Sequence, residues 1–561
     1  MHKTMDETVG RRAAVRRIDD GPSETSPRRA GAFAGTNSYS SDPILGALVD
    51  AALDEESEED LLALGAYWGS AEAHEVARIA WCNRPTIRRD DFDGRRIDQV
   101  ELHPAAHALL NRSVAAGLLS SAWEEGEAAH QHRLRAAALF LAAGTERAHL
   151  TAASATHAAV AALAYAPDIE AEVFPLVASR RYDRRALPAE DKDGVLISLA
   201  ISERERDGVR GGLGTRGELL TGDGIRIKGE KTFVCAPNAD YLLTLVRTPE
   251  GPTAALVARH APENADSFAV ESIVSFGGME AQAIATVRFF GAIGRTLGEP
   301  GRGVQVLRDV GTLLQLDAAV VCAGSLRSVL SRAGHVLRTH VSTGARPLLE
   351  DPLTMRLVAD VALTSAAQTA LALRAAGAFD RAFERDGDHA VARVLTPAAR
   401  VFCEKSGIAA AAEMREVIGG IALPADNPAA RAGADMTVFC QWVGSANQAA
   451  HELVALVARD GRVLDDALDE LGADLGNQNS DLIDRTAALG REAVADPGLA
   501  RAFADQLAMV GAASAMRQSL PRMVSDAFIS ARLRGGYTAL HGALDGRFDA
   551  AALIDFIIPE D

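Results

Sequence analysis

The order of segment types along the chain constrains its fold more than any single residue does. Ala- and Leu-rich segments with helical periodicity come first, for example residues 134–163. Short β-branched segments separated by Gly, Pro and Asp-Gly then occupy residues 195–290. Beyond Gly303 the helical period returns in four apolar segments of bundle length. This order predicts a mostly α protein with a small central β-domain, of the barrel or sandwich type.

The expected elements follow from the same pattern. Strands are predicted at 195–199, 225–228, 241–246, 254–257 and 285–290. Bundle helices are predicted at 304–337, 353–380, 391–417 and 436–459. The chain is predicted to divide into a disordered tail, an N-terminal helical domain, a middle β-domain, a four-helix bundle and a C-terminal helical extension, at residues 1–40, 41–190, 191–302, 303–461 and 462–561.

Charge and cysteine content disfavour several classes of protein. The formal net charge is −18, and acids outnumber arginines in residues 462–561, which disfavours binding to nucleic acid or to an anionic membrane. The five cysteines form no CxxC pair, so reduced structural thiols are expected and a metal site is not. No apolar run approaches a bilayer span, and the Arg-rich start lacks the apolar region of a signal peptide. We therefore expect a cytoplasmic protein.

Several stretches resemble motifs of the acyl-CoA dehydrogenase superfamily in order and spacing. They are Leu199–Glu203, Gly229–Phe233, Pro237–Asp240, Leu297–Gly303, Gly419–Ile421 and Trp442–Asn447. The AidB-like branch is indicated by Asp93–Asp98, His103-Pro104 with His107, and Trp123-Glu124-Glu125. The resemblance extends from about residue 38 to about residue 540. It implies an N-terminal helical domain, a middle β-domain, a four-helix bundle and an extra C-terminal helical extension.

The resemblance also implies FAD as the cofactor and an acyl-CoA or acyl-thioester substrate. In such proteins a Glu removes the α-proton of the thioester while the flavin takes the β-hydride. The chain is expected to form oligomers, with itself or with an acyl-CoA dehydrogenase-like partner. The positions that match cofactor-contacting positions of the family are Ser202, Glu203, Thr232, Gly419, Gly420, Gly444, Ser445 and Asn447.

The positions that carry the family's chemistry differ in this sequence. Val443 occupies the position of the catalytic Glu, and the alternative base position is Leu314 followed by Gln315. Neither position can accept a proton. Thr232 replaces the aromatic residue that covers the flavin. The resemblance therefore predicts a retained scaffold with changed chemistry, and no catalytic residue is assigned.

Two further motifs also depart from the family pattern. The Gly-Ser-Asp that contacts the phosphates is represented by Asp207-Gly208-Val209, so its hydroxyl is lost, and Glu205 and Asp207 would repel a pyrophosphate. The Arg-x-x-Phe-Gly motif that reaches a neighbouring subunit's FAD is represented by residues 341–345, ahead of Arg346-Pro347, without its Arg or its Phe. An Arg of the AidB-like motif is replaced by Ala434, with Arg431 nearby.

Some residues admit both a structural and a functional interpretation. Asp317 could substitute as base, but a structural acid is the favoured interpretation. His103 and His107 have i, i+4 spacing suited to a metal, but no third ligand accompanies them, so a structural role is favoured. Cys440 is expected to pack rather than react. Glu203 is expected to be a solvated cap more often than a ligand contact. The bundle glycines suit either helix ends or cofactor contact.

Four functions remain open from the sequence. The first is a divergent flavoprotein, for which an acyl-CoA dehydrogenase-like (AidB-like) scaffold is the best single description. The second is a non-catalytic subunit that completes an intact acyl-CoA dehydrogenase-like partner. The third is a nucleic-acid-binding alkylation-response protein, which the negative charge disfavours. The fourth is a flavin-free biosynthetic enzyme that reuses the same pocket.

Overall fold

The computed structural model describes residues 33–124, 130–204, 213–339, 348–382, 386–535, 541–542, 544 and 547–558, without side chains at 382 and 386–389. Phe33–Asp561 form one compact unit. The phosphate-contacting stretch around Asp207–Val209 and the motif at 341–347 lie outside the described residues, as do Glu125 and the expected tail up to Ala32.

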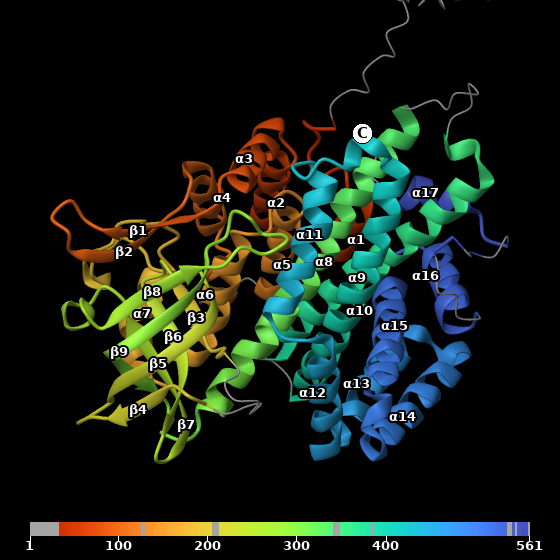
Figure 1. The fold of residues 1–561 in the computed structure, drawn as a ribbon. Coiled ribbons are helices and arrows are strands. Elements are labelled where there is room, and N and C mark those ends of the chain that lie inside the picture. The colour runs from red at the N-terminus through yellow and green to blue at the C-terminus, as the bar shows by residue number, and fades with distance from the viewer. Residues whose placement is uncertain are drawn as a thin grey trace, which may run out of the picture. The chain divides into compact units, whose positions relative to one another are not determined.

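Helices and one β-hairpin make up the N-terminal part (Figure 1). They are α1 (Pro43–Val49), α2 (Glu55–Trp68), α3 (Ala71–Cys82), β1 (Thr86–Asp90), β2 (Arg96–Glu101), α4 (Pro104–Ala115), α5 (Gln131–Ala143), α6 (Leu150–Leu163) and α7 (Pro167–Val177). The antiparallel hairpin was not predicted; its connection contains Asp93-Gly94, and Gly94 has a φ of 78° that favours glycine.

Two sequence expectations for this part differ from the structure. The helical segment predicted at 134–163 is two helices, α5 and α6, and in the connection between them the Glu146 carboxylate accepts hydrogen bonds from the backbone N–H groups of Ala148 and His149. Residues 33–40, which we placed in the tail, contact α2: Asn37 donates to the Leu62 carbonyl at 2.8 Å. Tyr39 is buried there.

The middle part is a β-domain. Its strands are β3 (Ile197–Ala200), β4 (Arg216–Leu219), β5 (Gly224–Cys235), β6 (Tyr241–Thr248), β7 (Gly251–Ala258), β8 (Phe268–Ile273) and β9 (Ile284–Leu297). Within the described residues they form one sheet in the order β3-β6-β4-β5-β9-β7, with β8 on β9 and a further β6–β7 pairing. The five predicted strands are present, whereas β4 and β8 were missed: β4 has only exposed and half-buried positions, and the two buried positions of β8 are adjacent, so neither shows the alternation typical of a half-buried strand.

The bundle consists of long helices that lie alongside one another (Figure 1). They are α8 (Gly303–Thr339), α9 (Pro352–Ala382), α10 (Asp386–Ile418), α11 (Pro428–Trp442) and α12 (Ala446–Arg459). The helix predicted at 436–459 is therefore interrupted. Gly444 has a φ of 100°, which ends α11, and the Ser445 hydroxyl accepts a hydrogen bond from Gln448 N–H and starts α12.

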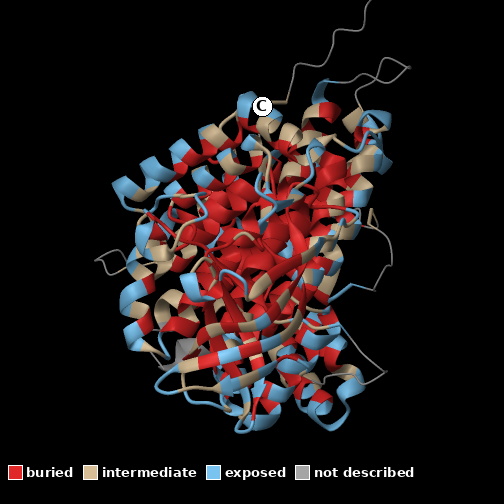
Figure 2. Cartoon of the chain, turned by 60° about the vertical axis from the view of Figure 1, so that its left-hand side comes forward, coloured by how far each residue is buried: buried red, intermediate tan, exposed pale blue. Residues whose placement is uncertain are grey.

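The C-terminal helices are α13 (Arg462–Leu475), α14 (Ser480–Ala495), α15 (Ala500–Ser519), α16 (Arg522–Phe528) and α17 (Ala550–Ile557). Helix α15 packs on α9 and α10, and α13 packs on α10. These contacts make the extension a cover over the outer side of the bundle. Exposed residues are accordingly confined to the rim of the molecule in Figure 2.

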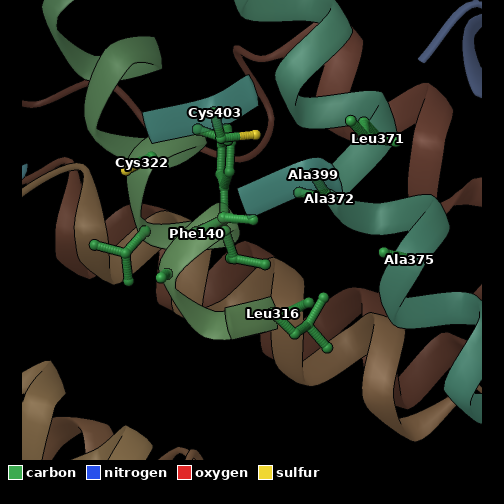
Figure 3. Close-up of a cluster of buried hydrophobic side chains, with 14 of the residues drawn as sticks. Phe140, Leu316, Cys322, Leu371, Ala372, Ala375, Ala399 and Cys403 are labelled. Carbon is green, nitrogen blue, oxygen red and sulfur yellow. The ribbon is translucent and has the colours of Figure 1, made fainter. Parts of the chain in front are cut away.

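The core of the bundle is made of small and branched side chains. Phe140 of α5 meets Leu316 and Cys322 of α8 there (Figure 3). Leu371 of α9 and Cys403 of α10 complete the cluster. Among the described residues, α8 is the one helix long and apolar enough to cross a membrane, but 94% of its apolar window is buried in the protein. Helix α8 is therefore the central core helix.

Candidate functional site

A cavity of about 460 Å³ lies where the β-domain meets the bundle. Small-molecule sites commonly span roughly 300–1,000 Å³. The β-domain lines the cavity with Leu199, Ile201, Ser202, Phe233, Cys235, Phe276 and Ile284, and the bundle lines it with Leu307, Val310, Gly311, Leu314, Val438, Gln441, Trp442, Val443, Gly444 and Gln448. The motifs that follow β3 and end α11 therefore meet in one cavity.

Phe233 lines this cavity from an irregular stretch of β5. The register with β9 shifts between Lys231 and Val234, and Phe233 has a φ of 56°. Such a backbone conformation is costly for a bulky residue and is found at functional sites. The Phe233 ring is 52% exposed, and its centroid lies 6.0 Å from that of Phe276. The aromatic surface that Thr232 lacks is thus supplied by the next residue.

Ser202 and Thr232 join the end of β3 to β5. The backbone N–H of Thr232 donates to the Ser202 carbonyl at 2.8 Å. Thr232 is buried, and its hydroxyl has no hydrogen-bond partner in the part of the chain that the structure describes. A buried hydroxyl without a partner is uncommon in folded proteins. This hydroxyl therefore marks a place beside the cavity where a further polar group would fit.

Glu203 pairs with a buried lysine, whereas the sequence favoured a solvated cap. The Lys231 ammonium lies 2.7 Å from Glu203 Oε1 and also donates to the carbonyls of Ile201 and Leu245, at 3.2 and 2.7 Å. Burial is the largest influence and opposes ionisation of Glu203, but the hydrogen bond and charge of Lys231, together with hydrogen bonds from Thr215 and Gly214, outweigh it and lower the pKa of the carboxyl. The pair therefore holds β5 against the end of β3.

Arg400 of α10 supports the backbone on the bundle side of the cavity. Its guanidinium donates to the carbonyls of Cys440, Gly444 and Ser445, with distances of 3.0 Å to Cys440 and 3.3 Å to Ser445. The Arg400 side chain is 1% exposed and lies 3.6 Å from the Glu404 carboxylate. These bonds hold the break between α11 and α12. No pattern in the sequence indicated Arg400, because its partners are backbone atoms distant along the chain.

Glu452 is a second residue that sequence reasoning missed. Val443 and Leu314, which the sequence predicts at the two base positions, line the cavity. Gln315, which follows Leu314, donates its amide to Glu452 Oε2 at 2.9 Å. Gln448 lines the cavity and donates to Glu452 Oε1 at 2.9 Å. The Glu452 carboxylate is therefore hydrogen-bonded to a residue that lines the cavity. Its i, i+4 spacing from Gln448 was the available signal.

The remaining predicted cofactor positions lie elsewhere. Among the described residues, Gly419, Gly420 and Asn447 do not line the cavity. Gly419 follows α10 with a φ of 82°, so its glycine serves the helix end. Asn447 accepts a weak hydrogen bond from Arg501 at 3.4 Å. Ser445 caps α12, and its hydroxyl is thereby occupied.

The residues with two interpretations have structural partners. His103 accepts a hydrogen bond from Ala105 N–H at 3.1 Å as the N-cap of α4, whereas His107 contacts the Tyr182 hydroxyl at 2.7 Å. No cluster of three potential metal ligands occurs within the described ranges. Cys440 lies 2.9 Å from Cys322, sulfur to sulfur. The hydrogen bond with Cys322 and burial raise the pKa of the Cys440 thiol, which makes it a poor nucleophile.

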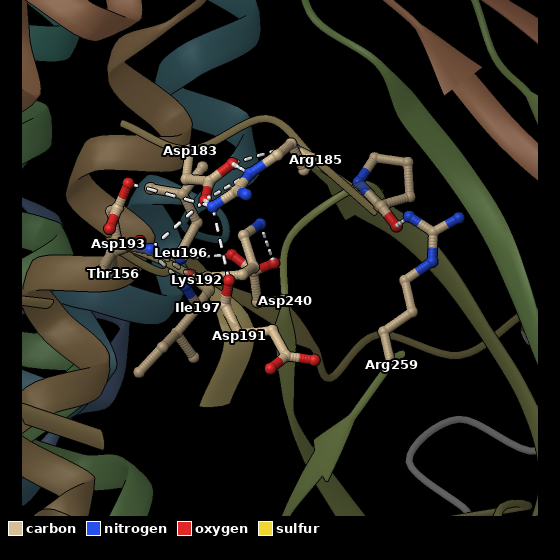
Figure 4. A network of polar contacts seen from close by, with 11 residues as sticks. Thr156, Asp183, Arg185, Asp191, Lys192, Asp193, Leu196, Ile197, Asp240 and Arg259 are labelled. Atoms are coloured by element: carbon tan, nitrogen blue, oxygen red, sulfur yellow. Dashed lines mark hydrogen bonds and ion pairs between the residues drawn. The ribbon is translucent and has the colours of Figure 1, made fainter. Parts of the chain in front are cut away.

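A polar groove of about 1,090 Å³ runs between the β1–β2 hairpin and the β-domain. In Figure 4, Lys192 pairs with Asp240 at 2.5 Å, and Asp240 accepts a hydrogen bond from Leu196 N–H at 2.8 Å. Arg259 donates to the Pro237 carbonyl at 2.6 Å. Burial raises the pKa of Asp240 despite the neighbouring ammonium. Through these contacts the Pro237–Asp240 motif holds its own loop against β3.

The chain shares its sequence and fold with known proteins. Residues 29–184 match the adaptive response protein AidB N-terminal domain, and residues 301–461 match the acyl-CoA dehydrogenase C-terminal domain. The chain is 31% identical over 514 residues to the putative acyl-CoA dehydrogenase AidB of Escherichia coli strain K12, covering 89% of this chain and 93% of the relative.

Two solved structures show the same architecture. The structure of Caenorhabditis elegans ACDH-11 in complex with C11-CoA matches with a TM-score of 0.77 at 18% identity, covering 94% of this chain and 92% of that one. Butyryl-CoA dehydrogenase from Megasphaera elsdenii matches with a TM-score of 0.56 at 16% identity, covering 72% of this chain and 98% of that one. The predicted fold class is thus confirmed. The chain belongs to the acyl-CoA dehydrogenase superfamily, in its AidB-like branch.

Proposed function

We propose that this protein binds FAD in the 460 Å³ cavity and oxidises a substrate of the acyl-thioester class there. The observation that carries the proposal is the meeting of Ser202 with Trp442 and Gly444 around one cavity. Members of the superfamily are FAD flavoproteins, and a glutaryl-CoA dehydrogenase from Mycobacterium smegmatis is known in complex with FADH2. The relative ACDH-11 is known in complex with C11-CoA.

The residues present fit a flavin ring. The cavity walls are mainly apolar, and Phe233 and Trp442 provide aromatic surface for stacking. Ser202 provides a polar group at its β-domain side. Bound FAD would supply an acceptor for a hydride. The chain itself would orient the substrate and exclude water through Leu199, Ile201 and Leu314.

We infer that Glu452 serves as the proton acceptor of this cavity. Gln315 and Gln448 hold its carboxylate from two sides, and Gln448 reaches the cavity. Glu452 is exposed and does not itself line the cavity, so proton transfer to it would pass through one intervening water. Glu452→Gln conserves the shape and removes the basic oxygen. It should leave FAD binding intact and remove the acidic limb of the pH profile of substrate oxidation, whereas Glu492→Gln, an exposed control, should change neither.

The visible absorption spectrum of the purified protein tests cofactor binding. Gly311 lines the cavity, and a Cβ added there meets no atom within 4 Å, so Gly311→Leu fills cavity space without disturbing the helix. Gly46 in α1 is equally open and lies outside the cavity, which makes Gly46→Leu the matched control. We expect flavin bands in the wild type and the control and their loss in Gly311→Leu. A wild-type protein that takes up no added FAD contradicts the proposal.

A non-catalytic subunit is the second candidate. Of the described residues that line the cavity, none carries a carboxylate. If oxidation requires an intact homologous chain that co-purifies with this one, the partner-completing function replaces the first, whereas an unchanged oxidation rate in Glu452→Gln contradicts only the assignment of the base. A homo-oligomer that oxidises an acyl-CoA alone excludes it.

A further inference from the structure

A separate cavity of about 60 Å³ lies between α8, α5 and the segment before α1. None of its described lining residues lines the cavity of the proposed flavin site. Its polar lining includes Arg327, His74, Ser328 and Thr36. At roughly 10–15 Å³ per water, this volume corresponds to about four to six water positions. The space is therefore too small for a nucleotide and large enough for a small ion.

Arg327 brings an unused hydrogen-bond donor to this cavity. Its Nε and Nη2 donate to the Asp42 carboxylate, at 2.7 and 2.6 Å, but Nη1 is buried without a partner in the described chain. Asp42 also accepts from the backbone N–H groups of Ile44 and Leu45, both at 3.0 Å, so its oxygens are fully used. A buried charged donor without an acceptor is costly. Nη1 therefore needs an acceptor from outside the chain.

The surroundings of this cavity carry an excess of positive charge. Arg332 lies 3.2 and 3.3 Å from the ring nitrogens of His74, and its Nε has no partner among the described residues. Arg431 is fully buried, and within the same part of the chain none of its three guanidinium nitrogens has a partner. Burial, with the charges of Arg431 and Arg147, lowers the pKa of Arg332 to about 9. The cluster therefore holds guanidinium groups that would be stabilised by an added negative charge.

The carboxylates nearby do not balance these arginines. Asp42 pairs with Arg327, and Asp435 pairs with Arg147 at 3.1 Å. Glu146 is bound by His149 at 2.5 Å. Arg332 and Arg431 have no carboxylate within ion-pair distance in the described chain. Buried charges are normally paired, so the missing partner is an anion.

We propose that the 60 Å³ cavity binds a small inorganic oxyanion, phosphate or sulfate in class. Arg327 and the Ser328 and Thr36 hydroxyls provide donors around the space, the Asp42 carboxylate that pairs with Arg327 also lines it, and Arg332 contacts the lining residue His74 without lining the space itself. The bound anion fastens the segment from Phe33 to Asp42 onto α8. This site is independent of FAD and of acyl-thioester oxidation.

Titration of the purified protein with inorganic phosphate tests the site. Ionic strength is held constant with potassium chloride, and calorimetric binding and the Tm are measured. We expect one saturable site per chain and, at a hundred times the Kd, a rise in Tm of roughly 2 °C. The same response with sulfate is expected. A response equal to that of potassium chloride, or no binding heat, overturns the proposal and leaves the space to water.

Two variants connect that response to the cavity. Ser328→Leu fills the space and retains every charge, and the exposed Ser519→Leu is its control. Arg332→Gln removes one charge, and Arg462→Gln, whose side chain is 87% exposed, is its control. Phosphate binding should be lost in Ser328→Leu, weakened at least tenfold in Arg332→Gln and unchanged in both controls. Unchanged binding in Ser328→Leu would place the anion elsewhere and overturn the assignment.

Discussion

Asp317 of α8 receives both of its charge-assisted hydrogen bonds from Arg135 of α5, at 2.7 and 2.8 Å, and each side chain is 2% exposed. Arg135 also donates to the Leu118 carbonyl at 2.8 Å. Asp317 is not among the described residues that line the 460 Å³ cavity. Asp317 was considered from the sequence as a substitute base, but both of its carboxylate oxygens are bound by Arg135. This pair joins the N-terminal helices to the bundle.

Breaking this pair should destabilise the protein. Arg135→Met leaves a buried carboxylate without its partner, which costs roughly 3–5 kcal/mol, whereas the double variant with Asp317→Leu should recover most of that loss. Chemical denaturation measures both. Arg462→Met at the exposed contact with Asp460 is the control and should change stability by less than about 1 kcal/mol. An Asp317→Asn protein of unchanged stability but without activity would restore Asp317 as a base.

The Glu203–Lys231 pair should make stability depend on acid pH. Because the folded pKa of Glu203 is lowered, its contribution is present above the unfolded value of about 4.3 and is lost as pH falls through the folded value. Glu203→Gln should therefore be less stable than the wild type at pH 7, and the difference should shrink towards pH 3. Denaturation curves at several pH values measure this. A constant difference would mean that the ion pair contributes nothing through charge.

Buried histidines should make the protein less stable below neutral pH. Burial lowers the pKa of His74 to about 2, of His132 to about 3 and of His260 to about 4. The unfolded chain binds protons at these positions below about pH 6.5 and the folded chain does not, so stability rises with pH across this range. Each histidine contributes about 1 kcal/mol per pH unit. His132→Gln should flatten the slope between pH 5 and 6.5, and the exposed His451→Gln should leave it unchanged.

The cysteines should differ sharply in reactivity. Cys82 is exposed, whereas Cys235, Cys322, Cys403 and Cys440 are buried. Burial raises the pKa of the Cys235 and Cys403 thiols, so little thiolate is present near neutral pH. Mass spectrometry after maleimide treatment should find Cys82 modified in the native protein and the other four only after denaturation. Native labelling of Cys440 would show that α11 opens.

The fold was readable from the sequence where one periodicity dominates. Helices α8, α9 and α10 were placed within a few residues because their apolar period continues for many turns. The break at Gly444 was not placed, since it depends on a positive φ held by Arg400 from another helix. Strand β4 was missed because its side chains are mostly exposed or half-buried and give no apolar alternation.

The candidate site was predictable only in part, because some of its residues matter through contacts with residues distant in sequence. Ser202 and Gly444 come from motifs separated by most of the bundle, and family spacing placed both at the cavity. Glu452 and Arg400 belong to no motif, because their importance comes from contacts across helices. A partner that is distant in sequence cannot be identified from local pattern alone.

The contacts that hold the break between α11 and α12 determine the shape of the cavity rim, and they do not involve the side chain at position 443. Arg400 donates hydrogen bonds to main-chain oxygens from outside the cavity. The backbone conformation of the rim therefore does not depend on the side chain at position 443. A carboxylate can therefore be gained or lost at Val443 during evolution without rebuilding the scaffold. The backbone of the rim can therefore keep its shape while related proteins carry different reactive side chains on it.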